Sequence, residues 1–243
     1  MKKVLNVVFG AALMGSALTA AAGDIAGNVT LATDYRFRGI SQDHGKFSPA
    51  IQGGFDWSSD MGIYIGTWAS NVNFTEAAIE TDVYGGYRGK FNEDVEYDIG
   101  VLYYGYPQDG SQHLAYTEFY GSVSLMGAKL GVNYSDNYFG GSGKFYYPYI
   151  NYSHDLFEGF SISAHYGYNK FDNEQTGNPF GDGPLALGGN DSYSDWSIGI
   201  STEQFGVTWA LTYVDTDLDD DQDCFGDEDL CAATAVFSIS KSL

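Results

Sequence analysis

The sequence predicts an all-β fold, a transmembrane antiparallel up-and-down β-barrel of about twelve strands. Short segments throughout the chain alternate apolar and polar residues with a period of two, as strands between two different surroundings do. The composition, with 20 tyrosines, 32 glycines and 5 prolines, favours strands over helices. After Leu18 no apolar run is long enough for a transmembrane helix, so a chain that enters lipid must close into a barrel.

The first 22 residues are typical of a signal peptide. Two lysines precede an apolar run over residues 4–18, and three alanines over 20–22 offer a cleavage site near Ala22–Gly23. The apolar run is too short to span a bilayer comfortably. We therefore expect a cleaved signal peptide over residues 1–22 and one outer-membrane barrel domain over residues 23–243.

The expected strands follow one another at short intervals. Each shows alternation over roughly the ten residues that a tilted barrel strand needs to cross a bilayer. In chain order they lie at residues 28–39, 50–57, 62–72, 79–88, 95–101, 118–125, 129–134, 144–154, 160–169, 195–201, 207–213 and 233–243. Pro148 weakens the eighth of them as a strand.

The connections between these segments alternate in length. Two-residue Met126–Gly127 and the short "EQFG" contrast with the long "FDNEQTGNPFGDGPLALGGND" and "DLDDDQDCFGDEDL". Outer-membrane barrels have short periplasmic turns and longer outer loops. The longest connections follow odd-numbered strands, which predicts that both termini lie in the periplasm.

The first expected strand carries an unusual pattern in "TDYRFRGISQ", residues 33–42. Asp34, Arg36 and Arg38 share one face, and Tyr35 and Phe37 share the other. A soluble core would not accept the charged face. We expect Tyr35 and Phe37 to face lipid and the three charged residues to face a polar lumen.

The segments "TDYRFRGISQ", "PAIQGGFDW", "GIYIGTWASNV" and "VFSISKSL" resemble the TorF-type porins of Gram-negative bacteria. The resemblance covers most of the mature chain and is densest over residues 28–72 and the last thirty or so. It implies an outer-membrane β-barrel with no established solute, and it transfers no functional residue.

Charged residues on the inward faces are the candidate pore lining. They are Asp34, Arg36, Arg38, Asp56, Asp82, Arg88, Glu96, Asp98 and Glu118. We expect Arg36 to meet Asp56 on the neighbouring strand, and Arg88 to meet Glu96 across a tight turn. Such charges either form a constriction that selects solutes by sign, or are structural ion pairs that fill a narrow barrel.

The acidic last connection, residues 215–231, suggests two further features. Cys224 and Cys231 are the two cysteines of the chain, and export permits them to form a disulfide. Asp217, Asp219, Asp221 and Glu228 match positions 1, 3, 5 and 12 of a calcium-binding loop. Gln222 stands where that loop needs glycine and no helices are expected to flank it, so a solvated acidic loop is the preferred interpretation.

Several classes of function are disfavoured. A net charge of −21 repels nucleic acid. The four histidines form no zinc motif, and no serine lies in a G-x-S-x-G elbow, so we expect no enzyme, no catalytic residue and no cofactor.

Two hypotheses of function remain. The first is a mildly cation-preferring porin of the outer membrane, through which small hydrophilic solutes diffuse passively. The second is a non-conducting structural or surface-interaction barrel. The expected partners are outer-membrane lipid, lipopolysaccharide and, for the first hypothesis, the solutes; a homo-oligomer is left open.

Overall fold

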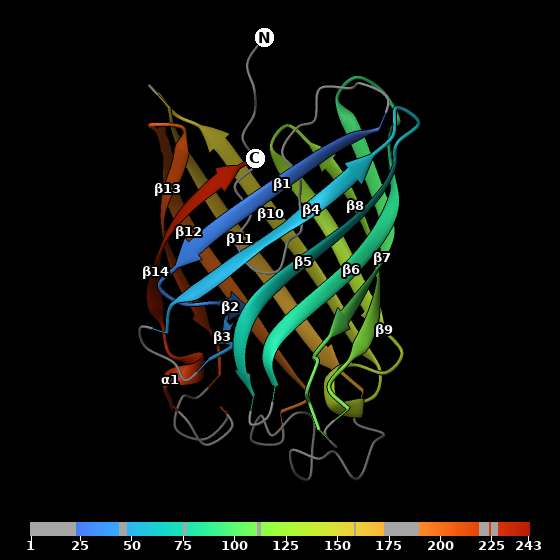
Figure 1. Cartoon of the computed structure of the whole chain (residues 1–243), viewed down its shortest axis with the longest axis vertical. Helices are drawn as coiled ribbons and strands as arrows, with labels where there is room; N and C mark the ends of the chain where they lie inside the picture. Colours follow the sequence, from blue (N-terminus) through green and yellow to red (C-terminus); the bar gives the residue numbers. More distant parts are fainter. Residues whose placement is uncertain are drawn as a thin grey trace.

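Twelve strands close into one antiparallel barrel in the computed structural model (Figure 1). The structure describes residues 23–43, 48–74, 77–110, 113–157, 159–172, 190–218, 224 and 228–243. The predicted signal peptide therefore lies outside the described residues. No helix within the described ranges is long and apolar enough to cross a membrane.

The predicted fold class is confirmed, because each barrel strand pairs with its neighbours around a complete ring. The barrel strands are β1 (Asp24–Ala32), β4 (Ala50–Ser58), β5 (Ile63–Phe74), β6 (Ala77–Lys90), β7 (Val95–Gly105), β8 (Tyr116–Leu125), β9 (Ala128–Ser135), β10 (Phe145–Asp155), β11 (Phe160–Phe171), β12 (Ser192–Gln204), β13 (Val207–Thr216) and β14 (Thr234–Ser242). Strand β1 closes the ring by pairing with both β4 and β14. Within the described residues the remaining elements are the short strands β2 (Arg36–Phe37) and β3 (Ile40–Ser41), the 3₁₀ turn η1 (Phe139–Gly141) and the helical turn α1 (Glu228–Cys231).

The start of β1 and the end of β14 lie at the same end of the barrel (Figure 1). Gly27 and Leu243 exchange backbone hydrogen bonds there, at 3.4 and 2.8 Å. The tight connections, such as Met126–Gly127, lie at this end, which we call the turn end. The helical turn α1 and the described parts of the longer connections lie at the opposite end, which we call the loop end.

The outer face of the barrel is apolar from strand to strand. The alternation predicted from the sequence places every second residue outward, and these side chains are exposed although they are large and hydrophobic. Examples from successive strands are Leu31, Ile51, Ile65, Val83, Ile99, Phe119, Val132, Ile150, Tyr166, Ile198, Leu211 and Phe237. A continuous apolar surface of this kind needs an apolar environment around it.

Inward tyrosines lie against glycines of the adjacent strand. A Cβ atom added to Gly131 would lie 2.3 Å from the Tyr149 ring, and one added to Gly100 would lie 2.3 Å from the Tyr120 hydroxyl. Pro148, the expected weak point of β10, lies where the β10–β11 ladder skips from Tyr146 to Tyr149. A missing N–H is tolerated at such a gap.

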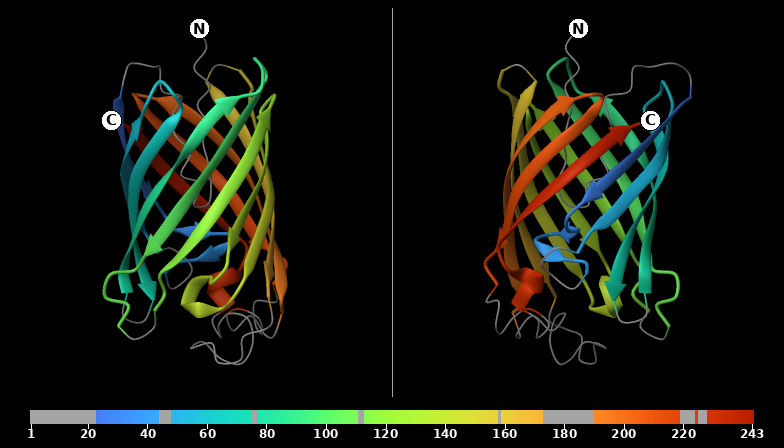
Figure 2. Two further views of the ribbon diagram at one scale, coloured as in Figure 1. Left: turned by 90° about the vertical axis from the view of Figure 1, so that its right-hand side faces the viewer. Right: turned by 60° about the vertical axis from the view of Figure 1, so that its left-hand side comes forward.

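The prediction for the first strand is wrong after Ala32. Strand β1 ends there, and Thr33–Gln42 turns into the barrel instead of continuing along the wall (Figures 1 and 2). Tyr35 does not face outward, because only 4% of its surface is exposed. The charged and the aromatic side chains of this segment both make their contacts inside the barrel.

Candidate functional site

The segment Thr33–Gln42 forms a small hairpin inside the barrel, near the loop end (Figure 2). Strands β2 and β3 pair through Arg36 with Ser41 and Phe37 with Ile40, leaving Arg38 and Gly39 as a two-residue turn. Both turn residues have positive φ, 49° and 84°, as hairpin turns of the I′ type require. A Cβ at Gly39 would lie 2.2 Å from Thr216 Cγ2, so only glycine fits against β13. We call Thr33–Gln42 the inward hairpin.

Arg36 ties the base of the inward hairpin to the last connection. Its Nε forms an ion pair with Asp34 at 2.5 Å, and Asp34 also accepts a hydrogen bond from Ser41 at 2.7 Å. Its Nη atoms donate to the backbone oxygens of Leu230 at 2.7 Å and of Asp229 and Ala232 at 3.2 Å. Asp56, the expected partner, lies elsewhere. The prediction failed because the segment leaves the wall and no longer runs beside β4.

Arg38 reaches the opposite part of the wall. Its Nη2 lies 2.8 Å from Glu118 Oε1 on β8, and its Nη1 donates to the Tyr138 hydroxyl at 3.2 Å. The guanidinium also lies 4.2 Å from the ring centroid of Tyr147 and 4.7 Å from that of Phe145, both on β10. Burial lowers the pKa of Arg38, but the Glu118 carboxylate and the neighbouring tyrosines, Tyr138 among them, together outweigh it and raise that pKa well above its usual value. The guanidinium is therefore charged at any relevant pH.

The aromatic residues of the inward hairpin, Tyr35 and Phe37, pack against the barrel wall. The Tyr35 hydroxyl donates to Glu80 on β6 at 2.9 Å, and its ring meets Trp68 on β5 edge to face. Phe37 meets Tyr104 on β7 in the same way, with ring centroids 5.7 Å apart. The Tyr193 hydroxyl on β12 donates to the Arg38 carbonyl at 3.0 Å. The inward hairpin thus contacts wall strands on both sides of the barrel and crosses its interior.

Among the described residues, carboxyl groups outnumber cations around the tip of the inward hairpin. Glu80, Asp82 and Glu118 are all at most 1% exposed, and Arg38 is the cation that pairs with one of them. Asp82 Oδ1 is buried without a hydrogen-bond partner among the described residues. This part of the interior therefore carries an excess of acidic groups.

A second polar group lies nearer the turn end. Arg88 Nε pairs with Asp98 at 3.0 Å, and Asp98 also accepts from the Tyr64 hydroxyl at 2.5 Å. Glu96, the expected partner of Arg88, pairs instead with Lys90 at the exposed rim. In the β6–β7 ladder Arg88 lies directly opposite Asp98, and Lys90 lies directly opposite Glu96. The predicted pairing of Arg88 with Glu96 was therefore wrong by two residues along β7.

Asp56 also faces the interior at the turn end, half-exposed, where it accepts a hydrogen bond from the Tyr84 hydroxyl. Gly54, two residues before Asp56 on β4, leaves no room for a side chain. A Cβ there would lie 2.1 Å from the Thr67 carbonyl oxygen, so the backbones of β4 and β5 approach too closely for a side chain.

Sequence reasoning missed a network around His165. Its Nε2 lies 2.9 Å from Asp195 Oδ1 and 2.7 Å from the Tyr147 hydroxyl, and its Nδ1 lies 2.5 Å from Asn151 Oδ1. His165 and Asn151 are direct cross-strand partners. The alternation placed His165 on an inward face, but its spacing matched no motif that would have singled it out.

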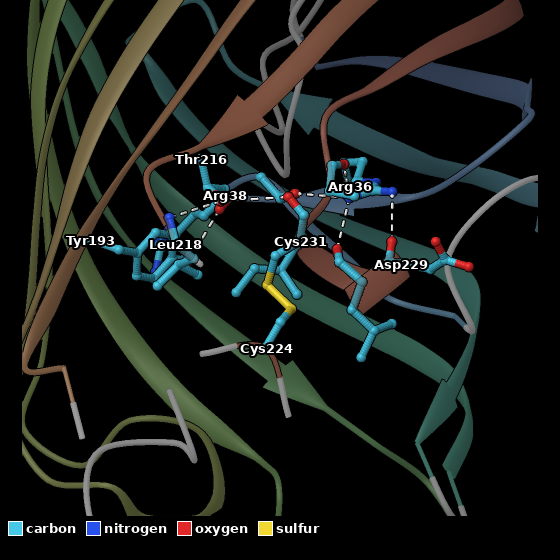
Figure 3. The surroundings of a disulfide bond; sticks show 12 residues. Arg36, Arg38, Tyr193, Thr216, Leu218, Cys224, Asp229 and Cys231 are labelled. Atoms are coloured by element: carbon cyan, nitrogen blue, oxygen red, sulfur yellow. Dashed lines mark hydrogen bonds between the residues drawn. A yellow bond between two sulfur atoms is a disulfide. The ribbon is translucent and has the colours of Figure 1, made fainter. Parts of the chain in front are cut away.

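The last connection contains the expected disulfide between Cys224 and Cys231 (Figure 3). Asp219 and Asp221 of the calcium hypothesis lie outside the described residues, so that arrangement stays a prediction. Among the residues that are described, no group of three or more His, Cys, Asp or Glu could hold a metal ion.

A model of the bacterial protein family Gcw_chp, whose function is unknown, matches residues 16–243. The chain belongs to the Gcw_chp family. No curated protein matches it in sequence. Membership of the Gcw_chp family does not test the resemblance to TorF-type porins, which stays a prediction.

Two solved porins share the architecture of this Gcw_chp protein. The KdgM porin is 9% identical with a TM-score of 0.52, over 89% of this chain and 97% of that one. The NanC porin is 12% identical with a TM-score of 0.52, over 89% of this chain and 98% of that one. At such identity the likeness concerns the fold, and the residues of the inward hairpin must be interpreted from their own contacts.

Proposed function

We propose that the protein is a channel of the bacterial outer membrane for passive diffusion of small hydrophilic solutes. The observation that carries the proposal is the closed barrel with an apolar outer face and a polar interior. From the middle of the strands toward the turn end, partly exposed serines line the interior, and they suit a water-filled lumen. They are Ser153, Ser161, Ser163, Ser197, Ser238 and Ser240.

The proposal extends to location and orientation. Export by the signal peptide over residues 1–22 would deliver the chain to the outer membrane, where its partners are lipid and lipopolysaccharide. The turn end, with both termini, would face the periplasm, because outer-membrane barrels keep their short turns there. The TorF-type resemblance supports the same assignment.

The inward hairpin is the constriction in this proposal. It brings Arg36, Arg38 and Asp34 into the interior and contacts the wall on both sides. Solutes crossing the barrel would have to pass between this hairpin and the wall. The charges that line the passage would then act on permeating ions at short range.

The charge of the interior favours cations. Asp56 is a partly exposed carboxylate that faces the interior and accepts a hydrogen bond from Tyr84, and a field of one sign concentrates counter-ions in a narrow passage. One solved structure of the KdgM porin holds disordered oligogalacturonate, a carboxylated oligosaccharide. The acidic interior described here would repel such a polyanion, so we expect a different class of solute.

A non-conducting structural barrel is the second candidate. It is favoured by the dense packing at the loop end, where Tyr104, Phe145 and Glu118 are at most 1% exposed. Conductance of the purified protein in planar lipid bilayers decides between the two. Discrete channel openings support the channel, and a barrel that inserts without conductance supports the structural role.

A further inference from the structure

Arg36 connects the inward hairpin to the one part of the loop end that is covalently closed (Figure 3). The backbone oxygens that it binds, on Asp229, Leu230 and Ala232, lie on both sides of Cys231. Cys231 is bonded to Cys224, and both cysteines are fully buried. The same cysteine's carbonyl oxygen lies 3.5 Å from Thr216 Oγ1 on β13.

The helical turn α1 does not hold this arrangement by itself. It has four residues, Glu228–Cys231, whereas isolated helices need roughly 12–15 residues to be even marginally stable in water. The last carbonyls of a helix have no partner within it, and here Arg36 supplies that partner. Both the disulfide and Arg36 therefore fix the position of α1, and α1 in turn fixes Arg36.

The remaining contacts of the inward hairpin are of a kind that water can replace. They are ion pairs, hydrogen bonds and the cation–π contacts of Arg38, with Tyr35, Phe37 and Ile40 as the apolar contributions. A buried ion pair adds little net stability, because both charges regain hydration when they separate. The closed position of the inward hairpin thus depends strongly on its anchor at α1.

We propose that the inward hairpin is a displaceable plug that the Cys224–Cys231 disulfide keeps closed, so that reduction of this bond opens the barrel. The part of this statement that concerns conduction rests on the proposed channel function. A dithiol reductant supplies the reaction. It forms a mixed disulfide with one cysteine and then its own ring disulfide, and two electrons and two protons convert Cys224 and Cys231 to thiols.

Thiol labelling tests the displacement without any reference to conduction. Ser41 lies on β3, is 2% exposed and has the size of a cysteine, so Ser41→Cys reports exposure of the plug. We expect its labelling by a membrane-impermeant maleimide to rise by about tenfold when Cys224→Ser and Cys231→Ser are added. Ser135→Cys, fully buried on the wall strand β9, is the matched control and should stay unlabelled in both backgrounds.

Equal protection of Ser41→Cys with and without the disulfide would overturn the proposal. Heat-modifiable migration on gels verifies that each variant has assembled. If the variant that combines Ser41→Cys with Cys224→Ser and Cys231→Ser does not assemble, Ser41→Cys protein is reduced and labelled instead. Peptide mapping then gives the same measurement at residue 41.

Conductance measurements distinguish a failure of the plug proposal from a failure of the channel proposal. We expect dithiothreitol to raise the conductance of the wild-type protein severalfold, and to leave unchanged the already high conductance of the variant without cysteines. Arg36→Gln should give the high conductance without reductant. Increased labelling with no conductance in any variant would refute the channel and retain the plug. Conductance that is the same in every variant, before and after reduction, would retain the channel and refute the plug.

Discussion

Arg38 and Glu118 form an ion pair inside the barrel, with the guanidinium 2.8 Å from Glu118 Oε1 and both side chains at most 5% exposed. Arg38 belongs to the tip of the inward hairpin and Glu118 to the wall strand β8. This ion pair can therefore form only while the tip of the hairpin lies against the wall. Removing one partner of such a pair is costly, about 3–5 kcal/mol, because it leaves the other charge buried alone.

Arg38→Ala should weaken the closed position of the inward hairpin. Glu118 would remain beside Glu80 and Asp82 without its cation, and hydration of these carboxylates favours the open form. We expect an assembled barrel with higher conductance and a stronger cation preference, measured by single-channel recording. Lys90→Ala, which removes a cation from an exposed rim pair, is the control and should change neither quantity. Unchanged conductance in Arg38→Ala would remove the inward hairpin from the constriction.

Lysine should be tolerated on the inner face of β12 and not on its outer face. Ile198 is 63% exposed near the middle of the strand, and a lysine facing lipid at mid-depth costs about 2–4 kcal/mol. Ser197 is its inward neighbour. Ile198→Lys should assemble poorly and Ser197→Lys well, as judged by heat-modifiable migration after refolding into detergent or lipid. Equal assembly of the two variants would contradict a membrane-spanning barrel.

Gly131→Ala should destabilise the barrel more than Gly121→Ala. A Cβ at Gly131 would overlap the Tyr149 ring at 2.3 Å, whereas at Gly121 the nearest heavy atom is 3.8 Å away. The ring must move off β9, and strained packing of this kind costs about 1–3 kcal/mol. Midpoints of urea unfolding in lipid vesicles compare the two variants. A larger loss at Gly121 would show that the close ring contacts do not matter.

Cations should be preferred over anions, and the preference should weaken at high salt because ions screen the interior charges. Reversal potentials under a potassium chloride gradient give its sign. Asp56→Asn removes a half-exposed interior carboxylate and should reduce the preference. Asp60→Asn makes the same change in net charge on an exposed turn and should have a smaller effect. An anion-selective reversal potential in the wild-type protein would contradict the assignment.

Alternation along the sequence is enough to predict the barrel and the two faces of its wall. Alternation predicts that the apolar members of each segment face outward, and Val83, Ile99 and Ile198 are exposed there. This works because the strand period is two, so a local pattern is enough to separate the two faces. The disulfide was also predictable, since an exported chain with two nearby cysteines offers a single pairing.

The departure of Thr33–Gln42 from the wall is apparent in the folded protein and not in the sequence pattern. The alternation of Asp34, Arg36 and Arg38 with Tyr35 and Phe37 continues through the end of β1, so period alone cannot distinguish a wall strand from a hairpin inside the barrel. The Arg38–Gly39 turn was a local signal that could have suggested a hairpin.

No local pattern in the sequence predicts the partners of Arg36 and Arg38. Arg36 binds backbone oxygens near residue 230, and Arg38 binds Glu118 on a distant strand. Such contacts exist only because ring closure brings the start of the chain beside its end, and because the hairpin folds across the enclosed space. The sequence determines which residues face inward, but the closed barrel determines which of them meet.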